Sequence, residues 1–233
     1  MLNKIEVWGD SIMKGVVLDT LTQKYYRLQE NACVCAAARV LGLPCINHAR
    51  FGMTSEKGLH VMEREAAQNA AGEIAVIGFG GNDIDFDWAD ITATPTQQHL
   101  PHTAPQRYAQ NIAAMVQLAR TRGMVPVLLS LPPIDGERYL AWVSKDEASR
   151  QSILRWLGSP QTIYDRHAHY NDILLRQAHC LGCTVVDVRS AFLAQPDYRA
   201  LLCADGIHPN EAGHALMQQT LVQYAQQHLP RTA

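Results

Sequence analysis

Long hydrophobic runs and an excess of charge of either sign are both missing from this chain. No uninterrupted apolar stretch approaches the ~20 residues that a helix needs to cross a bilayer, and the N-terminal MLNKIEVWGD lacks the apolar core of a signal peptide. The formal net charge is -2, and no long Lys/Arg run is available to neutralise a phosphate backbone. These absences argue against a membrane span and against nucleic acid as a partner, and they predict a cytoplasmic protein.

Linkers and repeats are missing as well. We find no internal repeat, no low-complexity tract and no Gly/Ser-rich or Pro-rich connection between domains. A chain of 233 residues with 47% hydrophobic content can build one sizeable core, although its length alone also permits two small domains. We therefore predict one domain over residues 1–233, with insertions near 83–105 and 132–161.

The six cysteines occur without secretory features, which favours reduced thiols over a disulfide framework. Cys33 and Cys35 form a CxC motif, and Cys180 and Cys183 form a CxxC motif. The CxxC lies where a helix gives way to a strand and has no aromatic neighbour. We expect most of the cysteines to be buried core residues, with redox or metal chemistry as the minor alternative. No metal and no cofactor are predicted.

Short apolar runs alternate with segments of helical spacing. The expected strands are Ile5–Trp8, Cys45–Asn47, Ile74–Phe79, Val125–Ser130 and Thr184–Val188. The expected helices are Asn31–Leu41, Gly58–Ala71, Pro105–Arg120, Tyr164–Leu181 and Glu211–Leu229. This alternation is typical of βαβ units and a parallel sheet, and right-handed crossovers place helices on both faces. The pattern predicts an α/β fold, a three-layer α/β/α sandwich with a parallel five-stranded sheet.

Polar residues follow the first and third expected strands. Ser11, in Gly9-Asp10-Ser11, comes at the carboxyl edge of a sheet, where ligands bind in open α/β folds, so it is a candidate nucleophile. The alternative is that Asp10 or Ser11 only caps a following helix. Asn82, in Gly80-Gly81-Asn82, reaches the same edge, where its amide either donates to an oxyanion or satisfies a turn.

Two binding motifs are excluded in this region. The glycines at 80 and 81 fail the dinucleotide fingerprint because Asp83 stands where its third glycine belongs. The alternating acids from Asp83 to Asp87 resemble a calcium loop at first sight. However, Trp88 occupies the position of the required glycine and Thr94 that of the bidentate glutamate, so calcium is rejected.

A third polar motif lies near the C-terminus, in CADGIHPNEAGH. Asp205 and His208 are three residues apart in a turn, so the carboxylate can reach one imidazole nitrogen while the other faces outward. This is how a general base is oriented and its imidazolium stabilised. The alternative is a histidine in a helix-capping loop beside an ordinary turn aspartate.

Together these stretches resemble the SGNH hydrolases, also called the GDSL esterase/lipase family. The family motifs are matched by Gly9-Asp10-Ser11, by Gly52 in NHARFGMTS, by Gly80-Gly81-Asn82-Asp83 and by Asp205-Gly206-Ile207-His208. Their order and spacing agree across nearly the whole chain. One departure is Ile12, where the family name has leucine, and this apolar exchange affects no catalytic group.

The resemblance implies a flavodoxin-like sheet and hydrolysis of an ester through an acyl-enzyme, with a small-molecule ester as the partner. Ser11 then attacks the carbonyl, His208 removes its proton and Asp205 holds the imidazole. The oxyanion hole consists of the backbone amides of Ser11 and Gly52 and the side-chain amide of Asn82. Gly52 is expected because a side chain would obstruct the oxyanion. No metal is required.

Two other readings stay open. Gly-x-Ser-x-Gly is absent, which excludes the nucleophile elbow of the α/β-hydrolases, and a P-loop is absent too. A flavodoxin-like binding module that keeps the motifs only as structure is the non-enzymatic alternative. A lysophospholipase or a thioesterase is the enzymatic one.

The segment 132–161 bears on the substrate. Its aromatic residues Tyr139, Trp142 and Trp156 are interspersed with charged residues, and no long apolar lid is visible for a long acyl chain, which gains about 0.8 kcal/mol per buried methylene. This favours a short acyl group, acetyl foremost, on a small molecule or carbohydrate. The three aromatic side chains either stack on a sugar or anchor the insertion to the core.

Overall fold

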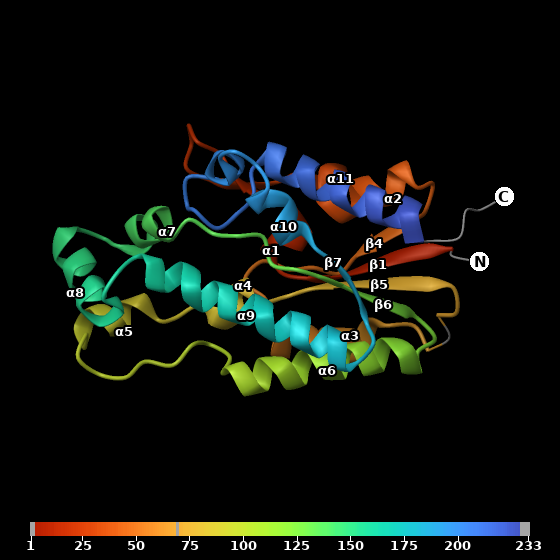
Figure 1. The fold of residues 1–233 in the computed structure, drawn as a ribbon, viewed down its shortest axis with the longest axis horizontal. Coiled ribbons are helices and arrows are strands. Elements are labelled where there is room, and N and C mark those ends of the chain that lie inside the picture. Colours follow the sequence, from red (N-terminus) through yellow and green to blue (C-terminus); the bar gives the residue numbers. More distant parts are fainter. Residues whose placement is uncertain (1–2, 69, 229–233) are drawn as a thin grey trace.

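A computed structural model of the chain describes residues 3–68 and 70–228. Its main sheet has five parallel strands in the order β4-β1-β5-β6-β7 (Figure 1). The strands are β1 (Lys4–Gly9), β4 (Cys45–Asn47), β5 (Glu73–Gly78), β6 (Val125–Leu129) and β7 (Thr184–Val186). When these five strands are numbered 1 to 5 along the chain, their order across the sheet is 2-1-3-4-5, which is the order of flavodoxin-like sheets. The predicted fold class, α/β with a parallel five-stranded sheet, is confirmed.

Helices cover both faces of the sheet (Figure 1). One face carries α2 (Cys33–Val40), α10 (Val188–Leu193) and α11 (Glu211–His228), and the other carries α3 (Ser55–Glu65), α6 (Pro105–Thr121) and α9 (Gln161–Cys180). Leu229, the expected end of the last helix, lies outside the described residues. Along β1, Val7 packs toward α2 and α11 while Trp8 packs toward α3 and α6, because successive strand residues point to opposite faces. The three predicted layers are confirmed.

Several predicted boundaries are wrong by one to six residues, and two of them have a clear cause. The helix α3 begins at Ser55 rather than at Gly58, because the side chain of Thr54 caps it by accepting a backbone hydrogen bond in its first turn. The last strand ends at Val186, because Asp187 caps α10 in the same way and turns the chain into that helix. In both places a capping side chain ends the extended backbone earlier than the apolar pattern suggests.

A second, antiparallel sheet pairs β2 (Val16–Leu18) with β3 (Tyr25–Arg27), a hairpin that the apolar pattern does not predict. All three residues of β3 are exposed, so no alternation of apolar and polar residues marks it. The side chain of Asp19 organises its turn by accepting hydrogen bonds from the backbone of Leu21 and Thr22. The hairpin follows α1 (Ser11–Lys14), a single turn directly after β1, and returns Tyr25 to the carboxyl edge of the sheet.

The two predicted insertions form short helices beyond the carboxyl ends of β5 and β6 (Figure 1). They contain α4 (Gly81–Ile84), α5 (Trp88–Ala93), α7 (Gly136–Val143) and α8 (Glu147–Leu157). Between them lies an apolar cluster, here named the α5–α8 cluster, with the buried members Phe86, Ile91, Ile134, Tyr139, Leu140, Ile153, Leu157 and Ile163. The two segments therefore share a small apolar core beyond the carboxyl ends of the strands.

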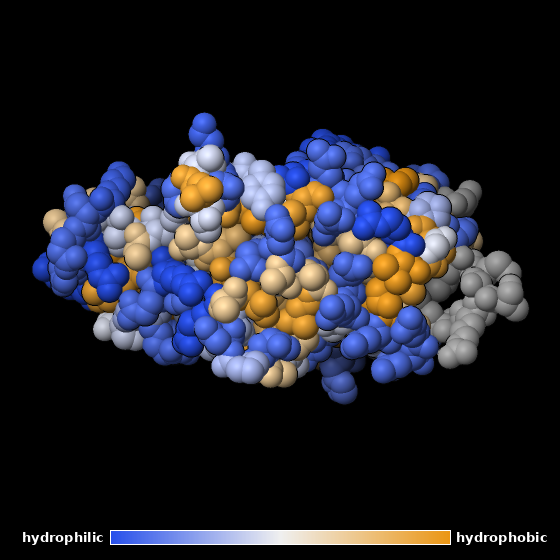
Figure 2. All heavy atoms as spheres, turned by 90° about the horizontal axis from the view of Figure 1, so that it is seen from above, coloured by the Kyte–Doolittle hydropathy of each residue, from blue (hydrophilic) through white to orange (hydrophobic). Residues whose placement is uncertain are grey.

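The remaining elements are two 3-10 helices, Gln29–Asn31 and Tyr198–Leu201. Over the face that carries α2 and α11, the surface is mainly hydrophilic, with apolar side chains in scattered patches (Figure 2). Scattered patches of this kind are ordinary for a folded protein. No helix within residues 3–68 and 70–228 is long and apolar enough to span a membrane.

Candidate active site

Ser11 stands at the first position of α1, directly after β1. The side chain of Asp10 caps this helix by accepting a hydrogen bond from the backbone N–H of Ile12 at 3.0 Å. Asp10 therefore satisfies the helix end, and the hydroxyl of Ser11 stays available for another partner. The capping role falls on Asp10, so capping does not compete with the nucleophile role that the sequence predicts for Ser11.

The structure brings Ser11 together with the C-terminal motif. The Nε2 atom of His208 lies 2.8 Å from the Oγ atom of Ser11, and its Nδ1 atom lies 2.7 Å from the Oδ2 atom of Asp205. All three side chains are buried. The result is a continuous line of hydrogen bonds from hydroxyl through imidazole to carboxylate, across 197 positions of the sequence.

Asp205 is held by four hydrogen bonds. Its Oδ1 atom accepts from the backbone N–H groups of Ile207 and His208, and its Oδ2 atom accepts from the His208 ring and from the hydroxyl of Tyr25 at 3.1 Å. Burial acts to raise the pKa of Asp205, but the hydrogen bond and charge of His208 and the two backbone donors outweigh burial and lower that pKa. The carboxylate is therefore ionised and fixed in orientation at neutral pH.

Gly206 attaches this turn to the insertion helices. Its φ is +75°, and an added Cβ would come within 2.7 Å of the carbonyl oxygen of Asp135 and 2.8 Å of the backbone nitrogen of Tyr139. The carbonyl of Gly206 also accepts a hydrogen bond of 2.8 Å from the backbone of Asp135. Only glycine allows this conformation and this close approach, so the turn rests directly on the start of α7.

Asn82 and Gly52 lie on the loops that follow β5 and β4. Asn82 lines the same cavity as Ser11 and His208, and its Nδ2 atom donates to the carbonyl of Met53 at 3.3 Å, which leaves one N–H free of that bond. Gly52 has a φ of +68°, and an added Cβ would meet nothing within 4 Å. The expected steric reason for this glycine is thus replaced by a conformational one, since L side chains rarely adopt a positive φ.

The cavity beside Ser11 has a volume of about 300 Å³ and is lined mainly by apolar residues. Its polar lining residues include Ser11, Asn82 and His208, and also Asp85, Arg166 and His167. The apolar wall comes from the insertions and α9, through Ile84, Phe86, Trp88, Ile134, Val143, Leu157 and Ile163. The arrangement offers a nucleophile, a base and a hydrogen-bond donor next to a small apolar compartment, which is suited to acyl transfer.

Comparison with known proteins agrees with this geometry. A family model described as the GDSL-like lipase/acylhydrolase family matches residues 7–216. The chain belongs to this family. All the motif residues described above lie inside the matched segment, and the family is one of ester-hydrolysing enzymes.

Individual relatives of this GDSL-family chain are distant. The GDSL esterase/lipase CPRD49 of Arabidopsis thaliana is 25% identical over 173 residues, which cover 72% of this chain and 60% of that protein. The chain thus spans about 60% of the length of this curated relative. Among solved structures, a lipase/acylhydrolase from Enterococcus faecalis superposes with a TM-score of 0.66 at 18% identity over 100% of both chains. A variant of an acetyl-xylooligosaccharide esterase from Geobacillus gives 0.64 at 17% identity, over 99% of this chain and 97% of the other. These two likenesses show a shared fold.

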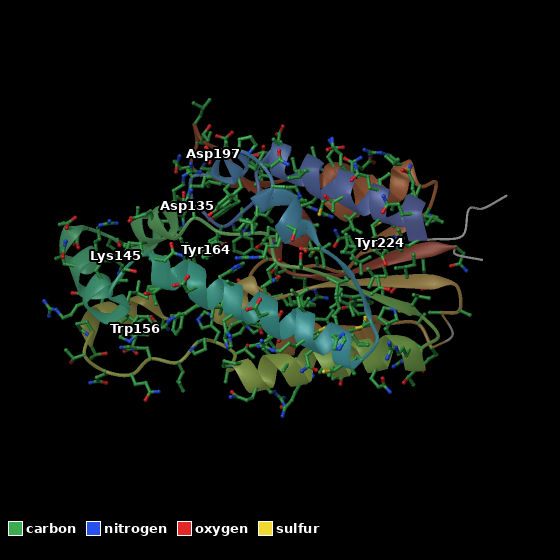
Figure 3. All side chains as sticks on the ribbon, in the orientation of Figure 1. Asp135, Lys145, Trp156, Tyr164, Asp197 and Tyr224 are labelled. Atoms are coloured by element: carbon green, nitrogen blue, oxygen red, sulfur yellow. The ribbon has the colours of Figure 1, made fainter. Side chains whose placement is uncertain are left out.

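The three aromatic residues singled out in the insertion of this GDSL-family chain separate into two groups. Tyr139 and Trp142 line the cavity, whereas Trp156 does not. Trp156 instead lies on α8 (Figure 3), with its ring 5.0 Å from that of Phe86 and beneath the guanidinium of Arg166 at 4.3 Å. The anchoring alternative describes Trp156, because its side chain packs the insertion onto α9.

The sequence motifs give no role to three further residues at the site. Tyr25 and Phe51 lie beside the imidazole of His208, with ring centres 5.2 and 6.2 Å from it. Asp83 is buried in the motif Gly80-Gly81-Asn82-Asp83 and accepts hydrogen bonds from the backbone and hydroxyl of Ser55. It thereby fastens the loop of Asn82 to the start of α3. The position of Asp83 next to Asn82 could have indicated a role at the site, whereas no local sequence pattern indicates one for Tyr25 or Phe51.

The expectation that most cysteines are buried is wrong. Only Cys33 and Cys203 are fully buried among the described residues, and Cys180 is exposed at the end of α9. No further metal ligands lie beside the CxxC pair, because the described part of the chain holds no group of three or more His, Cys, Asp or Glu side chains placed to bind a metal. The apolar pattern did not show that α9 ends at the surface.

Proposed function

We propose that this chain is a serine esterase that hydrolyses a carboxylic ester through a covalent acyl-enzyme. Ser11 is the nucleophile, His208 the general base and Asp205 the carboxylate that orients the imidazole. The observation that carries the proposal is the hydrogen-bonded line from Ser11 Oγ through His208 to Asp205, with distances of 2.8 and 2.7 Å. A binding module has no need for a serine hydroxyl aligned on an imidazole beside a cavity.

The reaction proceeds in two halves. His208 accepts the proton of Ser11 as its oxygen attacks the ester carbonyl, and the imidazolium that forms is stabilised by the ionised Asp205. His208 then gives that proton to the leaving alcohol, which leaves an acyl group on Ser11. In the second half a water molecule takes the place of the alcohol, and its proton passes through the same imidazole.

Negative charge develops on the carbonyl oxygen in both halves. We assign its donors to the backbone amides of Ser11 and Gly52 and to the side chain of Asn82. Asn82 is a neutral donor that keeps its protons throughout the pH range of the reaction. Fixed donors of this type act mainly on the transition state, because the ground-state carbonyl carries less charge.

The cavity supports a short acyl group. Its volume of about 300 Å³ accommodates acetyl or butyryl together with part of the alcohol. Asp85, Arg166 and His167 also line the cavity, so a long acyl chain would lie against polar side chains. The rest of the wall is mainly apolar, which suits a short acyl chain better than it suits a sugar.

The acceptor half of the ester is assigned to the aromatic mouth of the cavity. Trp142 is 40% exposed there, and its ring centre lies 6.3 Å from that of Tyr25. Tyr139 is a poorer platform because it is buried and its hydroxyl donates to Asp85 at 2.6 Å. We propose an acetylated carbohydrate or a similar small ester, a class that the name of the Geobacillus neighbour also contains.

Labelling with a fluorophosphonate tests the nucleophile. We expect the adduct on Ser11, and we expect Ser11→Ala and His208→Ala each to lower kcat by about 10⁴ with the fold intact, while Asp205→Ala costs less. Ser130→Ala is the matched control, because Ser130 follows β6 at the same sheet edge but donates its hydroxyl hydrogen to Asp187. Label on another serine, or no label at all, contradicts the proposed esterase and favours the binding module.

A series of p-nitrophenyl esters from acetate to palmitate tests the acyl group. We expect kcat/KM to be highest at acetate or butyrate. A steady rise toward long chains contradicts the short-acyl assignment and supports the lysophospholipase or thioesterase alternative. Acetylated carbohydrates are the next substrates to assay if the maximum lies at acetate.

A further inference from the structure

A pair of thiols lies apart from the cavity of Ser11. The Sγ atom of Cys35, on α2, is 2.8 Å from the Sγ atom of Cys45, the first residue of β4. A disulfide bond has a sulfur separation of about 2.05 Å, so only a small movement separates these thiols from a bond. The sequence pattern pairs Cys35 with Cys33 in a CxC motif, but Cys33 is buried on the inner side of α2 in the core.

The pair is reachable from solvent. Cys35 and Cys45 are half-buried and line a surface cleft of about 810 Å³, which none of the residues around Ser11 lines. The same cleft is lined by Arg27, Arg39 and Glu30. Arg39 forms an ion pair with Glu30 at 3.4 Å, whereas Arg27 uses its Nε atom on the carbonyl of Lys14 and offers its terminal nitrogens to a carboxylate of a ligand. This cleft has room for a small peptide-like molecule.

The thiols of Cys35 and Cys45 differ in pKa, which is lowered for Cys35 and raised for Cys45. The hydrogen bond from Cys45 is the main influence on Cys35, and together with the amide of Asn47 and the charge of Arg27 it outweighs burial and lowers the pKa of Cys35 to about 7. The same hydrogen bond, with burial, raises the pKa of Cys45 far above its usual range. Cys35 is thus the attacking thiolate and Cys45 the thiol that resolves the product.

We propose that Cys35 and Cys45 form a thiol–disulfide exchange site whose oxidant is a small, carboxylate-bearing disulfide. The thiolate of Cys35 attacks one sulfur of that disulfide, which forms a mixed disulfide and releases one thiolate. Cys45 then loses its proton to solvent and attacks the Sγ atom of Cys35, which forms the Cys35–Cys45 bond and releases the second thiolate. Two protein thiols are oxidised and one small disulfide is reduced to two thiols.

The other cysteines are not placed for this chemistry. Burial raises the pKa of Cys33 to about 12 and that of Cys203 to about 11. The Sγ atom of Cys183 donates to the backbone carbonyl of Pro126. Cys180 is exposed, but no second sulfur among the described residues is paired with it. Exchange at the Cys35–Cys45 pair is therefore selective.

The test treats the full chain with oxidised glutathione and maps its peptides by mass spectrometry without reduction. We expect an internal link between Cys35 and Cys45, reversed by dithiothreitol, and a loss of two of the six thiols on titration after denaturation. Cys45→Ser is expected to stop at the mixed disulfide on Cys35. Cys35→Ser is expected to slow the loss of thiols by about tenfold or more, because the attacking thiolate is removed and the pKa values of Cys33, Cys45 and Cys203 are raised.

Cys180→Ser is the matched control, since it removes an exposed thiol and is expected to leave the internal link unchanged. Circular dichroism of each variant checks that it is folded. The proposal is overturned if the wild-type chain keeps a stable mixed disulfide on Cys35, if oxidation falls first on Cys180, or if Cys35 and Cys45 do not react. None of these outcomes depends on whether the chain hydrolyses esters.

Discussion

At the scale of single residues, neighbouring groups make the competing hydrogen bonds at the site. The side chains of the proposed triad are therefore left to contact one another. Asp10 caps α1, so the hydroxyl of Ser11 is left for His208. Tyr25 and two backbone amides hold Asp205, so that its remaining acceptor position faces the imidazole. Each functional group is oriented by a contact that has no direct part in the proposed reaction.

Asn82→Ala tests the proposed oxyanion hole. We expect kcat to fall by about 10² to 10³ with little change in KM, because the amide acts on charge that develops in the transition state. Asn82→Asp keeps the size of the side chain but removes the donor, and it is expected to be no more active. A variant that loses only KM, with kcat preserved, contradicts the assignment. Thermal unfolding of both variants checks that the loop of α4 is retained.

Asp10→Asn tests the cost of a buried carboxylate. Burial raises the pKa of Asp10 from 3.8 to about 6, so the folded chain binds this proton more tightly than the unfolded chain does. The stability contribution of Asp10 therefore falls as the pH rises from about 4 to 6, and it stays low above that range. Asparagine keeps an oxygen acceptor for Ile12 and does not ionise. We expect it to raise the free energy of unfolding at pH 8 by up to about 3 kcal/mol, and to change little near pH 4.

Asp19→Asn is the control, because its effect on the free energy of unfolding at pH 8 is expected to be opposite to that of Asp10→Asn. The backbone N–H and hydroxyl of Thr22 lower the pKa of Asp19 in the exposed turn of the hairpin, so its contribution to stability is present above the usual pKa and is lost as the pH falls. Its replacement is expected to lower stability at pH 8. Denaturant unfolding at pH 4, 6 and 8 measures both variants. A difference for Asp10→Asn that does not change with pH contradicts the expected burial effect.

At the scale of elements, the insertions build the pocket while the sheet edge supplies the reactive groups. The helices α7 and α8 provide Tyr139, Trp142, Val143 and Leu157 to the cavity wall. Gly206 docks the turn of His208 on the start of α7. Movement of α7 is thus expected to disturb the proposed base and the acyl compartment together.

Leu157→Ala tests the role of α8 in acyl selection. Leu157 lines the cavity, and truncation to alanine removes three carbons from its wall. We expect the preferred acyl chain to lengthen by about two or three carbons, with a loss of 2–5 kcal/mol in stability that is roughly typical of buried leucines. The ester series measures the shift.

Ile153→Ala is the matched control for that variant. Ile153 belongs to the same α5–α8 cluster and is fully buried, but it does not line the cavity. It is expected to lose a similar amount of stability without a change in acyl preference. If the two variants shift the preference equally, the effect comes from general loosening of the cluster and not from the cavity wall.

At the scale of the whole molecule, the three largest of the four apolar clusters among the described residues differ in what surrounds them. Two lie against the faces of the main sheet, and both include residues of β1, β5 and β6. The α5–α8 cluster contains helices and loops only, beyond the ends of the strands. The α5–α8 cluster therefore contains no strand of the hydrogen-bonded sheet, whereas the two large clusters both pack on that sheet.

Hydrogen exchange tests this difference. We expect amides of α5 and α8 to exchange about tenfold faster or more than those of β1 and β5, because segments outside the main core open at lower free energy. Mass spectrometry of peptides from each element measures the rates at several denaturant concentrations. Equal protection in α8 and β5 contradicts the idea that the pocket helices form a separate, less stable unit.

The sequence by itself determined the sheet and the outline of the site. Buried strands of a parallel sheet are apolar on both sides, so runs such as Ile74–Phe79 stand out without knowledge of their neighbours. Ser11 and Asn82 were predicted from the rule that ligand groups gather at the carboxyl edge, and Asp205 and His208 from their spacing of three residues, while the resemblance to the family motifs supplied their expected roles. These signals are local, because each can be read within about ten positions of the sequence.

Only the tertiary structure decided which side chains meet. The exposed strand Tyr25–Arg27 has no apolar alternation, and Tyr25 gains its place beside Asp205 from a contact across 180 positions. Tyr139, Trp142 and Trp156 look equivalent in the sequence, yet helix orientation turns Trp156 away from the cavity. The partner of Cys35 is set in the same way, because the spacing of a motif fixes only neighbours along the chain, whereas packing of α2 against β4 fixes neighbours in space.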